Sequence, residues 1–339
     1  MIMRTFFLAL SLIAGPAYAD DSCSLAGDAA CDELAGCALG SDTSDCQAAC
    51  AAGSSDATFG VCAHYSAMAA VMSEPATPGS GTRGEGGPRG LWSGTINARG
   101  KYATEQIVRH YEVYVPISYD PRRPTPLVMV LGGFTVDMYG LPAYTELLRT
   151  ADLGGFIVVF PQQHYYNFGP SIGWVFAWNI YPTDWVPNGD WLQNPDVDFI
   201  RNLIDELGAL YNLDRTRVIA SGHSRGAGMS IILAFVLTDR VAGFLSEAGF
   251  ADANGFDDDM LDYTGERRIP GVLVHGTADP DVPFSSSERV VEVLEQIGEV
   301  EGEDFLFFDL DHVAHEWQPQ YNQDALDFLF DRPLPGGAP

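Results

Sequence analysis

From about residue 91 onward, short apolar runs alternate with helix-like segments, and this alternation constrains the fold more than any other feature of the sequence. Several of the runs are continuously apolar, as expected for strands in a sheet that is buried on both faces. The strand candidates are 107–116, 126–131, 155–160, 217–221, 241–247, 271–275 and 305–309. Strands that alternate with helices predict an α/β fold with a mostly parallel sheet.

The helix candidates lie between these strands. The clearest covers 196–211, where apolar residues recur at helical spacing directly after Pro195, a residue that favours the first turn of a helix. A second helix candidate begins after Ser224, a third covers 286–297, and a fourth covers 321–330.

Residues 218–226 read Val-Ile-Ala-Ser-Gly-His-Ser-Arg-Gly, a β-branched run followed by G-x-S-x-G and then by small residues that can start a helix. A strand that turns sharply into a helix leaves no room for side chains beside the turn, and Gly222 and Gly226 remove them. Ser224 is then directed out of the sheet, which makes it a candidate nucleophile for acyl transfer. The five-residue pattern alone is common, so this prediction depends on a base, an orienting acid and an oxyanion hole elsewhere in the chain.

A serine hydroxyl becomes nucleophilic when a histidine takes its proton, and a carboxylate holds that histidine in the right tautomer. In α/β chains with this elbow, the acid and then the histidine follow the serine along the sequence. The strand candidate 271–275 leads into a loop with Asp279 and Asp281, of which we favour Asp279. The last strand candidate leads to His312 and His315, of which we favour His315. His-x-x-His lacks a third ligand at a suitable spacing, so we expect no metal there. We also expect no cofactor.

An oxyanion hole needs backbone N–H groups directed at the developing negative charge. The residue after the nucleophile, Arg225, supplies one candidate N–H. The loop after 126–131 begins Gly132-Gly133-Phe134, and its glycines allow a close approach of the backbone to a carbonyl group. We therefore predict Phe134 N–H as the second donor.

Aromatic residues are concentrated in 162–191, between a strand candidate and a helix candidate. Rigid aromatic faces suit an aryl ester, a sugar ring or a polymer surface, whereas ordinary packing explains about half of such residues in a long loop. We predict Trp174, Trp178 and Trp317 as substrate-binding residues.

The first 19 residues have the features of an export signal: Arg4 at the start, an apolar stretch at 6–13, and Ala17-Tyr18-Ala19 as a cleavage site. The apolar stretch is too short to span a bilayer, and we expect a secreted protein without a membrane span. An uncleaved N-terminal anchor is the alternative.

All six cysteines lie shortly after this segment. An even, clustered set in an exported chain predicts up to three disulfides in a small module, with fifteen possible pairings. The segment around them resembles small Cys- and Asp-rich modules of exported proteins, some of which, such as Notch-type repeats, bind calcium. The module is expected to bind a surface, a polymer or calcium, or to be a spacer. The cysteines are Cys23, Cys31, Cys37, Cys46, Cys50 and Cys62.

The chain has 46 acidic and only 18 basic residues, for a formal net charge of −28. Nucleic acids and other polyanions are therefore poor candidates for partners. The composition predicts four regions: a signal peptide (1–19), a cysteine-rich disulfide module (20–73), a Gly/Pro/Ser linker (74–90) and an α/β domain (91–335).

Several motifs within 105–331 resemble the exported esterase family that contains polyhydroxybutyrate depolymerases and feruloyl or acetylxylan esterases. They are the segment 110–134, Gly-His-Ser-Arg-Gly, His-Gly-Thr-Ala-Asp-Pro-Asp-Val-Pro-Phe and His-Glu-Trp-Gln-Pro. The resemblance implies an α/β-hydrolase fold with Ser224 as nucleophile, Asp279 as acid and His315 as base. It also implies a secreted serine hydrolase that acts through an acyl-enzyme. Its substrates would be small-molecule or polymeric esters, either polyesters or feruloyl and acetyl esters of plant polysaccharides.

Three positions depart from the family pattern. Gly132-Gly133 stands where the family usually has His-Gly, Ala-His-Glu-Trp-Gln-Pro replaces Gly-His-Thr-Trp-Pro, and Arg225 replaces a small residue. We expect Arg225 to pair with a nearby acid rather than with a substrate carboxylate. The departures motivate a second hypothesis, a catalytically silent binding protein attached through its cysteine module. A peptidase with the same triad is a third.

Overall fold

The computed structural model describes residues 81–100, 106–181 and 190–335. The predicted signal peptide, the cysteine module and residues 74–80 of the predicted linker lie outside these ranges. In the described part of the chain, no helix is long and apolar enough to cross a membrane.

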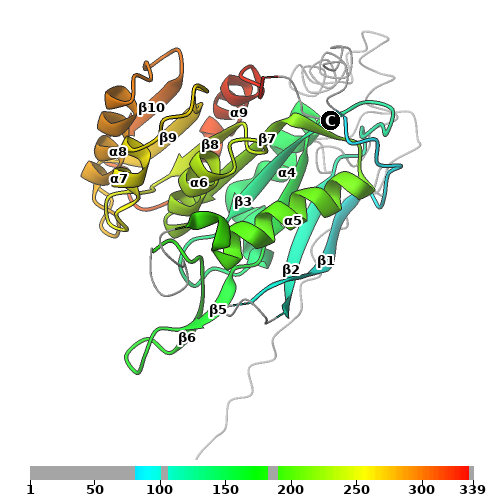
Figure 1. Cartoon of the computed structure of the whole chain (residues 1–339), viewed down its shortest axis with the longest axis horizontal. Coiled ribbons are helices and arrows are strands. Elements are labelled where there is room, and N and C mark those ends of the chain that lie inside the picture. Colours follow the sequence, from blue (N-terminus) through cyan, green and yellow to red (C-terminus); the bar gives the residue numbers. More distant parts are fainter. Residues whose placement is uncertain (1–80, 101–105, 182–189, 336–339) are drawn as a thin grey trace, which may run out of the picture. The chain divides into compact units, whose positions relative to one another are not determined.

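An eight-stranded sheet runs through the domain in the order β1-β2-β4-β3-β7-β8-β9-β10 (Figure 1). Strand β2 is antiparallel to both of its neighbours, and the other adjacent pairs are parallel. The prediction of a mostly parallel sheet is therefore confirmed. The strands are β1 (Gly90–Arg99), β2 (Gln106–Val115), β3 (Thr125–Leu131), β4 (Ile157–Pro161), β7 (Leu213–His223), β8 (Gly243–Glu247), β9 (Gly271–Gly276) and β10 (Phe305–Leu310).

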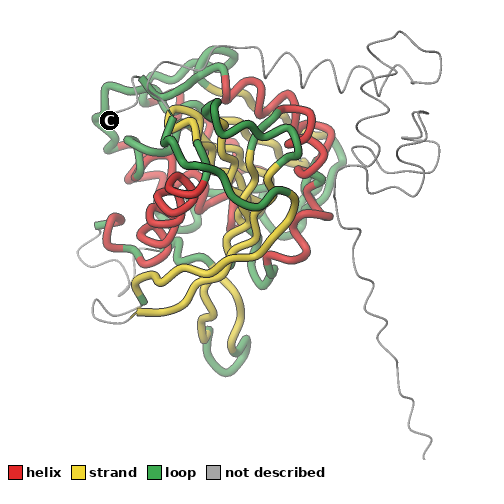
Figure 2. Tube along the Cα trace, turned by 90° about the vertical axis from the view of Figure 1, so that its right-hand side faces the viewer, coloured by secondary structure: helices red, strands yellow, loops and turns green. Residues whose placement is uncertain are grey.

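Helices cover both faces of the sheet, and Figure 2 shows them on either side of the strands. Successive side chains of a strand point to opposite faces. In β3, accordingly, Leu127 and Met129 belong to the buried cluster that includes residues of α5, α6, α7 and α8. Val128 and Val130 belong to the cluster that includes residues of α4 and α9. The helices are α3 (Leu141–Thr145), α4 (Leu147–Gly154), α5 (Pro195–Leu210), α6 (Arg225–Val236), α7 (Phe256–Leu261), α8 (Phe284–Gln296) and α9 (Asn322–Phe330).

A hairpin of β5 (His164–Asn167) and β6 (Trp174–Ala177) projects beyond the sheet and carries part of the aromatic segment (Figure 1). The seven predicted strands and four predicted helices agree with the structure to within a few residues. The strand β1 was not predicted, because it is an edge strand whose side chains alternate between more and less exposed positions. It therefore lacks the continuous apolar run that marks the central strands.

The structure corrects the predicted linker. Thr82 N–H donates to the carbonyl of Leu213 at 2.9 Å, and Gly86 N–H donates to the carbonyl of Leu210 at 2.8 Å. A Cβ on Gly84 would come within 2.5 Å of the Tyr211 backbone, so glycine is required for this close approach. Residues 81–89 therefore pack against the α/β domain, where backbone hydrogen bonds hold them, and they do not form a free linker.

Candidate active site

Ser224 lies in a strained turn between the end of β7 and the start of α6. Its φ of 56° and ψ of −121° belong to a region that residues other than glycine rarely occupy. A Cβ on Gly222 would lie 2.3 Å from the backbone of Gly226, and a Cβ on Gly226 would lie 2.0 Å from the carbonyl oxygen of Leu131. Both glycines are therefore needed for the strand to turn directly into the helix, as the sequence predicts.

The predicted acid, Asp279, is on the loop after β9, and its side chain is fully buried. The Oδ1 atom accepts the backbone N–H groups of Asp281 at 2.8 Å and Val282 at 2.9 Å. Burial alone would raise the pKa of Asp279, but these backbone bonds and the bond with His315 hold the pKa below its usual value. Asp281 is exposed and orients Asp279 through its backbone.

The predicted base, His315, follows β10, and its Nδ1 lies 2.7 Å from Oδ2 of Asp279. An ionised carboxylate can only accept, so Nδ1–H donates, and Nε2 is left as the proton acceptor that a serine needs. The rings of His315 and His223 are 4.6 Å apart, which places His315 beside the residue that precedes Ser224. The competitor His312 has a side chain that is 90% exposed and lies next to Asp311.

A second histidine contacts the acid, and the sequence analysis missed its role. His275 ends the predicted strand 271–275, where it was counted as part of the strand. Its Nε2 lies 3.1 Å from Oδ2 of Asp279 and 3.2 Å from the carbonyl of Val282, and its Nδ1 lies 2.7 Å from the hydroxyl of Ser287. Burial lowers the pKa of His275, which favours a neutral ring whose Nε2–H donates to Asp279.

The glycine loop after β3 lies against the nucleophile. A Cβ on Gly133 would be 3.3 Å from the Cβ of Ser224. The carbonyls of Gly132 and Gly133 are held by Trp178 Nε1 at 3.1 Å and by Gln163 Nε2 at 2.7 Å. Within the described ranges, no hydrogen-bond acceptor is found for the backbone N–H of Phe134 or of Arg225. The N–H groups of Phe134 and Arg225 are thus two backbone donors, without an acceptor in those ranges, on the segments that meet at Ser224. An oxyanion hole consists of such donors.

The structure corrects two of the three predicted substrate-binding tryptophans. Trp178 is 0% exposed and supports the glycine loop, and Trp317 is 3% exposed. The Trp317 indole N–H donates to Asn322 Oδ1, and its backbone N–H donates to Tyr144 Oη. Neither tryptophan offers a face to a substrate, because both are packed into the domain. Trp174, on β6, is 59% exposed and stacks on Tyr165.

Arg225 has surroundings that the sequence analysis did not predict. Its Nε donates to the carbonyl of Trp178 at 2.7 Å, and its guanidinium lies 5.1–5.6 Å from the ring centres of Phe134, Phe168 and Tyr181. Burial lowers the pKa of this guanidinium. The expected direct ion pair with an acid is not found in the described part of the chain, where Asp196 favours the charged form of Arg225 only through space.

Two buried titratable groups lie behind the nucleophile. His223 is buried, and desolvation together with the neighbouring His315 lowers its pKa to about 3. Glu247 ends β8 beside β7, and its backbone carbonyl accepts the N–H of Ser224 at 2.9 Å. The carboxyl group of Glu247 is fully buried, and burial raises its pKa well above the usual value. Burial therefore favours the neutral form of both groups.

Asp279, Asp281 and His315 also place three possible metal-ligand atoms within 4.8 Å of one another. Four N–H groups already bond the two Asp279 oxygens, including that of His315. The cluster is therefore explained by the hydrogen-bonded pair of Asp279 and His315, with the exposed Asp281 beside it.

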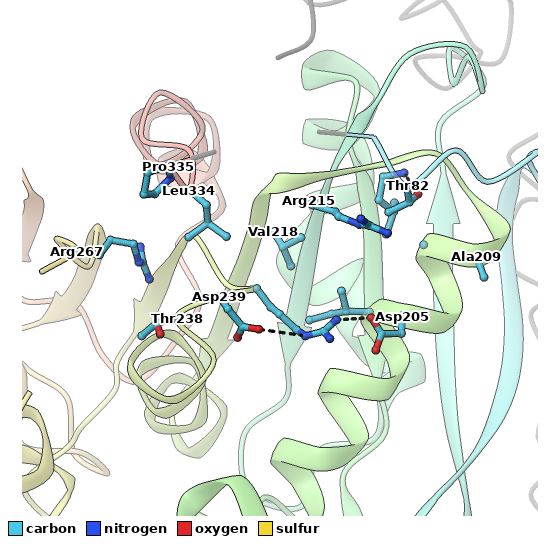
Figure 3. A pocket seen from close by; sticks show the side chains of 14 residues that line it. Thr82, Asp205, Ala209, Arg215, Val218, Thr238, Asp239, Arg267, Leu334 and Pro335 are labelled. Carbon is cyan, nitrogen blue, oxygen red and sulfur yellow. Dashed lines mark hydrogen bonds and ion pairs between the residues drawn. The ribbon is translucent and has the colours of Figure 1, made fainter. Parts of the chain in front are cut away.

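A cavity of about 630 Å³ lies near the amino-terminal end of β7, whereas Ser224 follows the carboxyl end of this strand (Figure 3). Its lining includes Leu213 and Val218, near the start of β7. Arg240 is among the lining residues and pairs with Asp205 and Asp239. This cavity is therefore separate from the candidate active site.

Residues 195–331 match the family model described as phospholipase/carboxylesterase. The chain is 31% identical over 159 residues to NocK of Nocardia uniformis subsp. tsuyamanensis, whose name assigns it to the esterases; this covers 47% of the chain and 41% of NocK. It is 28% identical over 195 residues to the bifunctional acetylxylan esterase/xylanase XynS20E of Neocallimastix patriciarum, covering 57% of the chain and 24% of that protein. The chain thus spans less than half the length of these two relatives.

The fold is similar to that of solved esterases. The acetyl xylan esterase from Aspergillus awamori superposes with a TM-score of 0.55 at 14% identity, covering 70% of this chain and 99% of that one. This similarity, the strand order and the family match agree on the architecture. The protein therefore has the α/β-hydrolase fold, and its residues 195–331 are similar to the phospholipase/carboxylesterase family.

Proposed function

We propose that this protein is a serine hydrolase of carboxylic esters, with Ser224 as nucleophile, His315 as base and Asp279 as the acid that orients His315. The observation that carries the proposal is the 2.7 Å contact between Asp279 Oδ2 and His315 Nδ1, next to a serine held in a strained elbow. A buried carboxylate bonded to the Nδ1 of a histidine near such a serine is the arrangement that acyl transfer needs.

In the proposed reaction, His315 Nε2 takes the proton of the Ser224 hydroxyl as its oxygen attacks the ester carbonyl carbon. The N–H groups of Phe134 and Arg225 stabilise the resulting oxyanion. His315 then gives the proton to the leaving alkoxide, and the acyl-enzyme forms. A water molecule, deprotonated by His315, attacks the acyl-enzyme, and the carboxylic acid and free Ser224 are released.

The proposed substrates are esters of polymers, either polyesters or acetyl and feruloyl esters of plant polysaccharides. The motif resemblance supports this choice, as do one relative whose name includes acetylxylan esterase and a structural neighbour named ferulic acid esterase. The exposed ring of Trp174, stacked on Tyr165, supplies an aromatic surface suited to sugar rings or polymer chains. The proposal includes secretion, on the sequence features of residues 1–19.

The test is hydrolysis of short p-nitrophenyl esters by the wild type and by Ser224→Ala, together with labelling of Ser224 by a fluorophosphonate. We expect measurable hydrolysis and labelling in the wild type and neither in the variant. Equal rates in the two proteins would contradict the proposal. Correct folding without labelling would favour the silent binding protein.

Acetylated xylan, feruloylated arabinoxylan and a polyhydroxyalkanoate film would then be compared as substrates. A short peptide amide series belongs in the same assay, because amide cleavage at a higher rate would favour the peptidase alternative.

A further inference from the structure

We propose that the guanidinium of Arg225 binds a carboxylate carried by the substrate, and that this enzyme selects esters with a free carboxylate group near the ester bond. The inference rests on the proposed function, because it assigns the substrate class of the site at Ser224. It concerns the side chain of Arg225, whereas the oxyanion hole uses the backbone N–H of the same residue.

The side chain of Arg225 lies beside that of Phe134, the residue that supplies the other proposed oxyanion donor. Arg225 directly follows Ser224, and its guanidinium lies 5.6 Å from the ring centre of Phe134. The two residues that supply the proposed oxyanion donors therefore also contact each other through their side chains. An ester whose carbonyl oxygen accepts these two N–H groups would carry its substituents near this pair of side chains.

The surroundings of the guanidinium hold it in place. Its Nε bonds to the Trp178 carbonyl at 2.7 Å, and the rings of Phe168 and Tyr181 flank it with centroids 5.5 and 5.1 Å away. The carbonyl and the rings are uncharged acceptors or π-faces, and they restrict the side chain without neutralising its charge. A preorganised guanidinium loses little entropy on binding a carboxylate.

The charge of Arg225 has no carboxylate partner in the described ranges, although burial of an unpaired charge is costly. Asp196 acts on Arg225 only through space and favours its charged form. The direct ion pair of Asp196 is with Arg109, whose Nη1 lies 2.7 Å from Oδ1. Arg109 shows how this fold treats a guanidinium that serves only packing: it is buried and directly paired with a carboxylate. Arg225 lacks such a pair beside the nucleophile, which a substrate carboxylate would supply with charge-assisted hydrogen bonds.

The charge of the whole chain adds to this argument. A protein with a net charge of −28 repels anionic substrates on average. The positive charge of Arg225, the residue after Ser224, offsets that repulsion locally for an anionic group of a bound substrate. A neutral ester offers this guanidinium only uncharged acceptors, which form weaker hydrogen bonds with it than a carboxylate does.

The test measures kcat/KM for two pairs of esters that differ only in a terminal carboxylate or carboxamide. The acyl-side pair is monomethyl adipate and the methyl ester of adipic acid monoamide. The alcohol-side pair is O-acetyl-hydroxyhexanoate and its carboxamide. We expect the carboxylate to carboxamide ratio of at least one pair to fall by about tenfold or more in Arg225→Gln, the size expected for losing a hydrogen bond to a charged group.

Two further variants define the cause. Arg225→Lys keeps the charge without the planar fork and should retain part of the ratio. Arg122→Gln removes one exposed cation that pairs with Asp120 on the surface and should leave the ratio unchanged. An unchanged ratio in Arg225→Gln on both pairs would overturn the inference.

Calorimetric binding of adipate and of adipamide to the wild type keeps the inference separate from catalysis and from the folding of any variant. We expect adipate to bind more tightly, and equal or weaker binding of adipate would overturn the inference. Preferential adipate binding by a protein that hydrolyses no ester would sink the proposed function alone. Ester hydrolysis without any carboxylate preference would sink the inference alone.

Discussion

The Oδ2 atom of Asp279 lies 2.7 Å from Nδ1 of His315 and 3.1 Å from Nε2 of His275, so two histidines share one buried carboxylate oxygen. His275 is fixed from its other side by Ser287 at 2.7 Å. The carboxylate is thereby held from three directions: two histidines and the backbone N–H groups of its own loop. A carboxylate positioned in this way can set both the tautomer and the orientation of His315.

The first prediction concerns this carboxylate. Asp279→Asn should lower kcat for p-nitrophenyl butyrate by about 10⁴-fold, because an amide can donate to Nδ1 and so favour the wrong tautomer of His315. Asp281→Asn is the matched control and should keep kcat within a few fold, since the hydrogen bond of Asp281 to Asp279 uses the backbone N–H, which this substitution retains. Similar losses of kcat in the two variants would show that activity depends on the conformation of the loop and not on the Asp279 carboxylate.

The second prediction separates the two histidines after β10. His315→Gln should abolish ester hydrolysis while leaving the far-UV circular dichroism spectrum unchanged, because the base is lost from a partly exposed position. His312→Gln should retain activity, since the His312 side chain is 90% exposed and lies beside Asp311 on the surface. Loss of activity in His312→Gln with retention in His315→Gln would reverse the assignment of the base.

The third prediction tests the elbow. Gly226→Ala should cost at least about 1–3 kcal/mol of unfolding free energy, because the new methyl group would lie 2.0 Å from the Leu131 carbonyl oxygen. Gly140→Ala is the control: a Cβ there meets nothing within 4 Å, and its φ of −81° suits alanine. Urea denaturation of both variants gives the comparison. A Gly226→Ala variant as stable as Gly140→Ala would mean that the elbow is looser than described.

The sequence predicts the central sheet well, and the reason is physical. Buried parallel strands are continuous apolar runs, so β3, β4 and β9 are visible without any tertiary information. Loops at the carboxyl ends of such strands carry the sites of α/β proteins, which leads to Asp279 and His315. The edge strand β1 lacks this signal, because its stability comes from pairing with β2.

The side-chain environments could not be predicted in the same way. An aromatic residue near a site has the same sequence signature whether it faces solvent, as Trp174 does, or packs under the glycine loop, as Trp178 does. His275 has a role because β9 and its following loop fold back onto Asp279, a contact that spacing alone does not encode. The groups around Arg225 come from the loop after β3, from the β5–β6 hairpin and from the segment after β6. Sequence spacing does not encode which of these segments contact Arg225.

The last prediction uses the buried Glu247. Burial raises the pKa of this carboxyl in the folded protein, so the folded state keeps a proton that the unfolded chain releases above about pH 4.5. Stability contributed by the protonated carboxyl is therefore present below pH 4.5 and is lost as the pH rises above it. Glu247→Gln carries no proton to lose and should gain on the wild type by up to about 1.4 kcal/mol per pH unit in that window.

Urea denaturation of wild type and Glu247→Gln from pH 4 to pH 8 measures this difference. The neighbouring His223 has the opposite dependence: its pKa is lowered to about 3, so its contribution to stability falls as the pH decreases below about 6.5. Both proteins contain His223, so its contribution cancels in the difference between them. Glu288→Gln, at an exposed position on α8, controls for the loss of one surface carboxylate. A constant difference between wild type and Glu247→Gln across the range would mean that Glu247 is ionised in the folded protein.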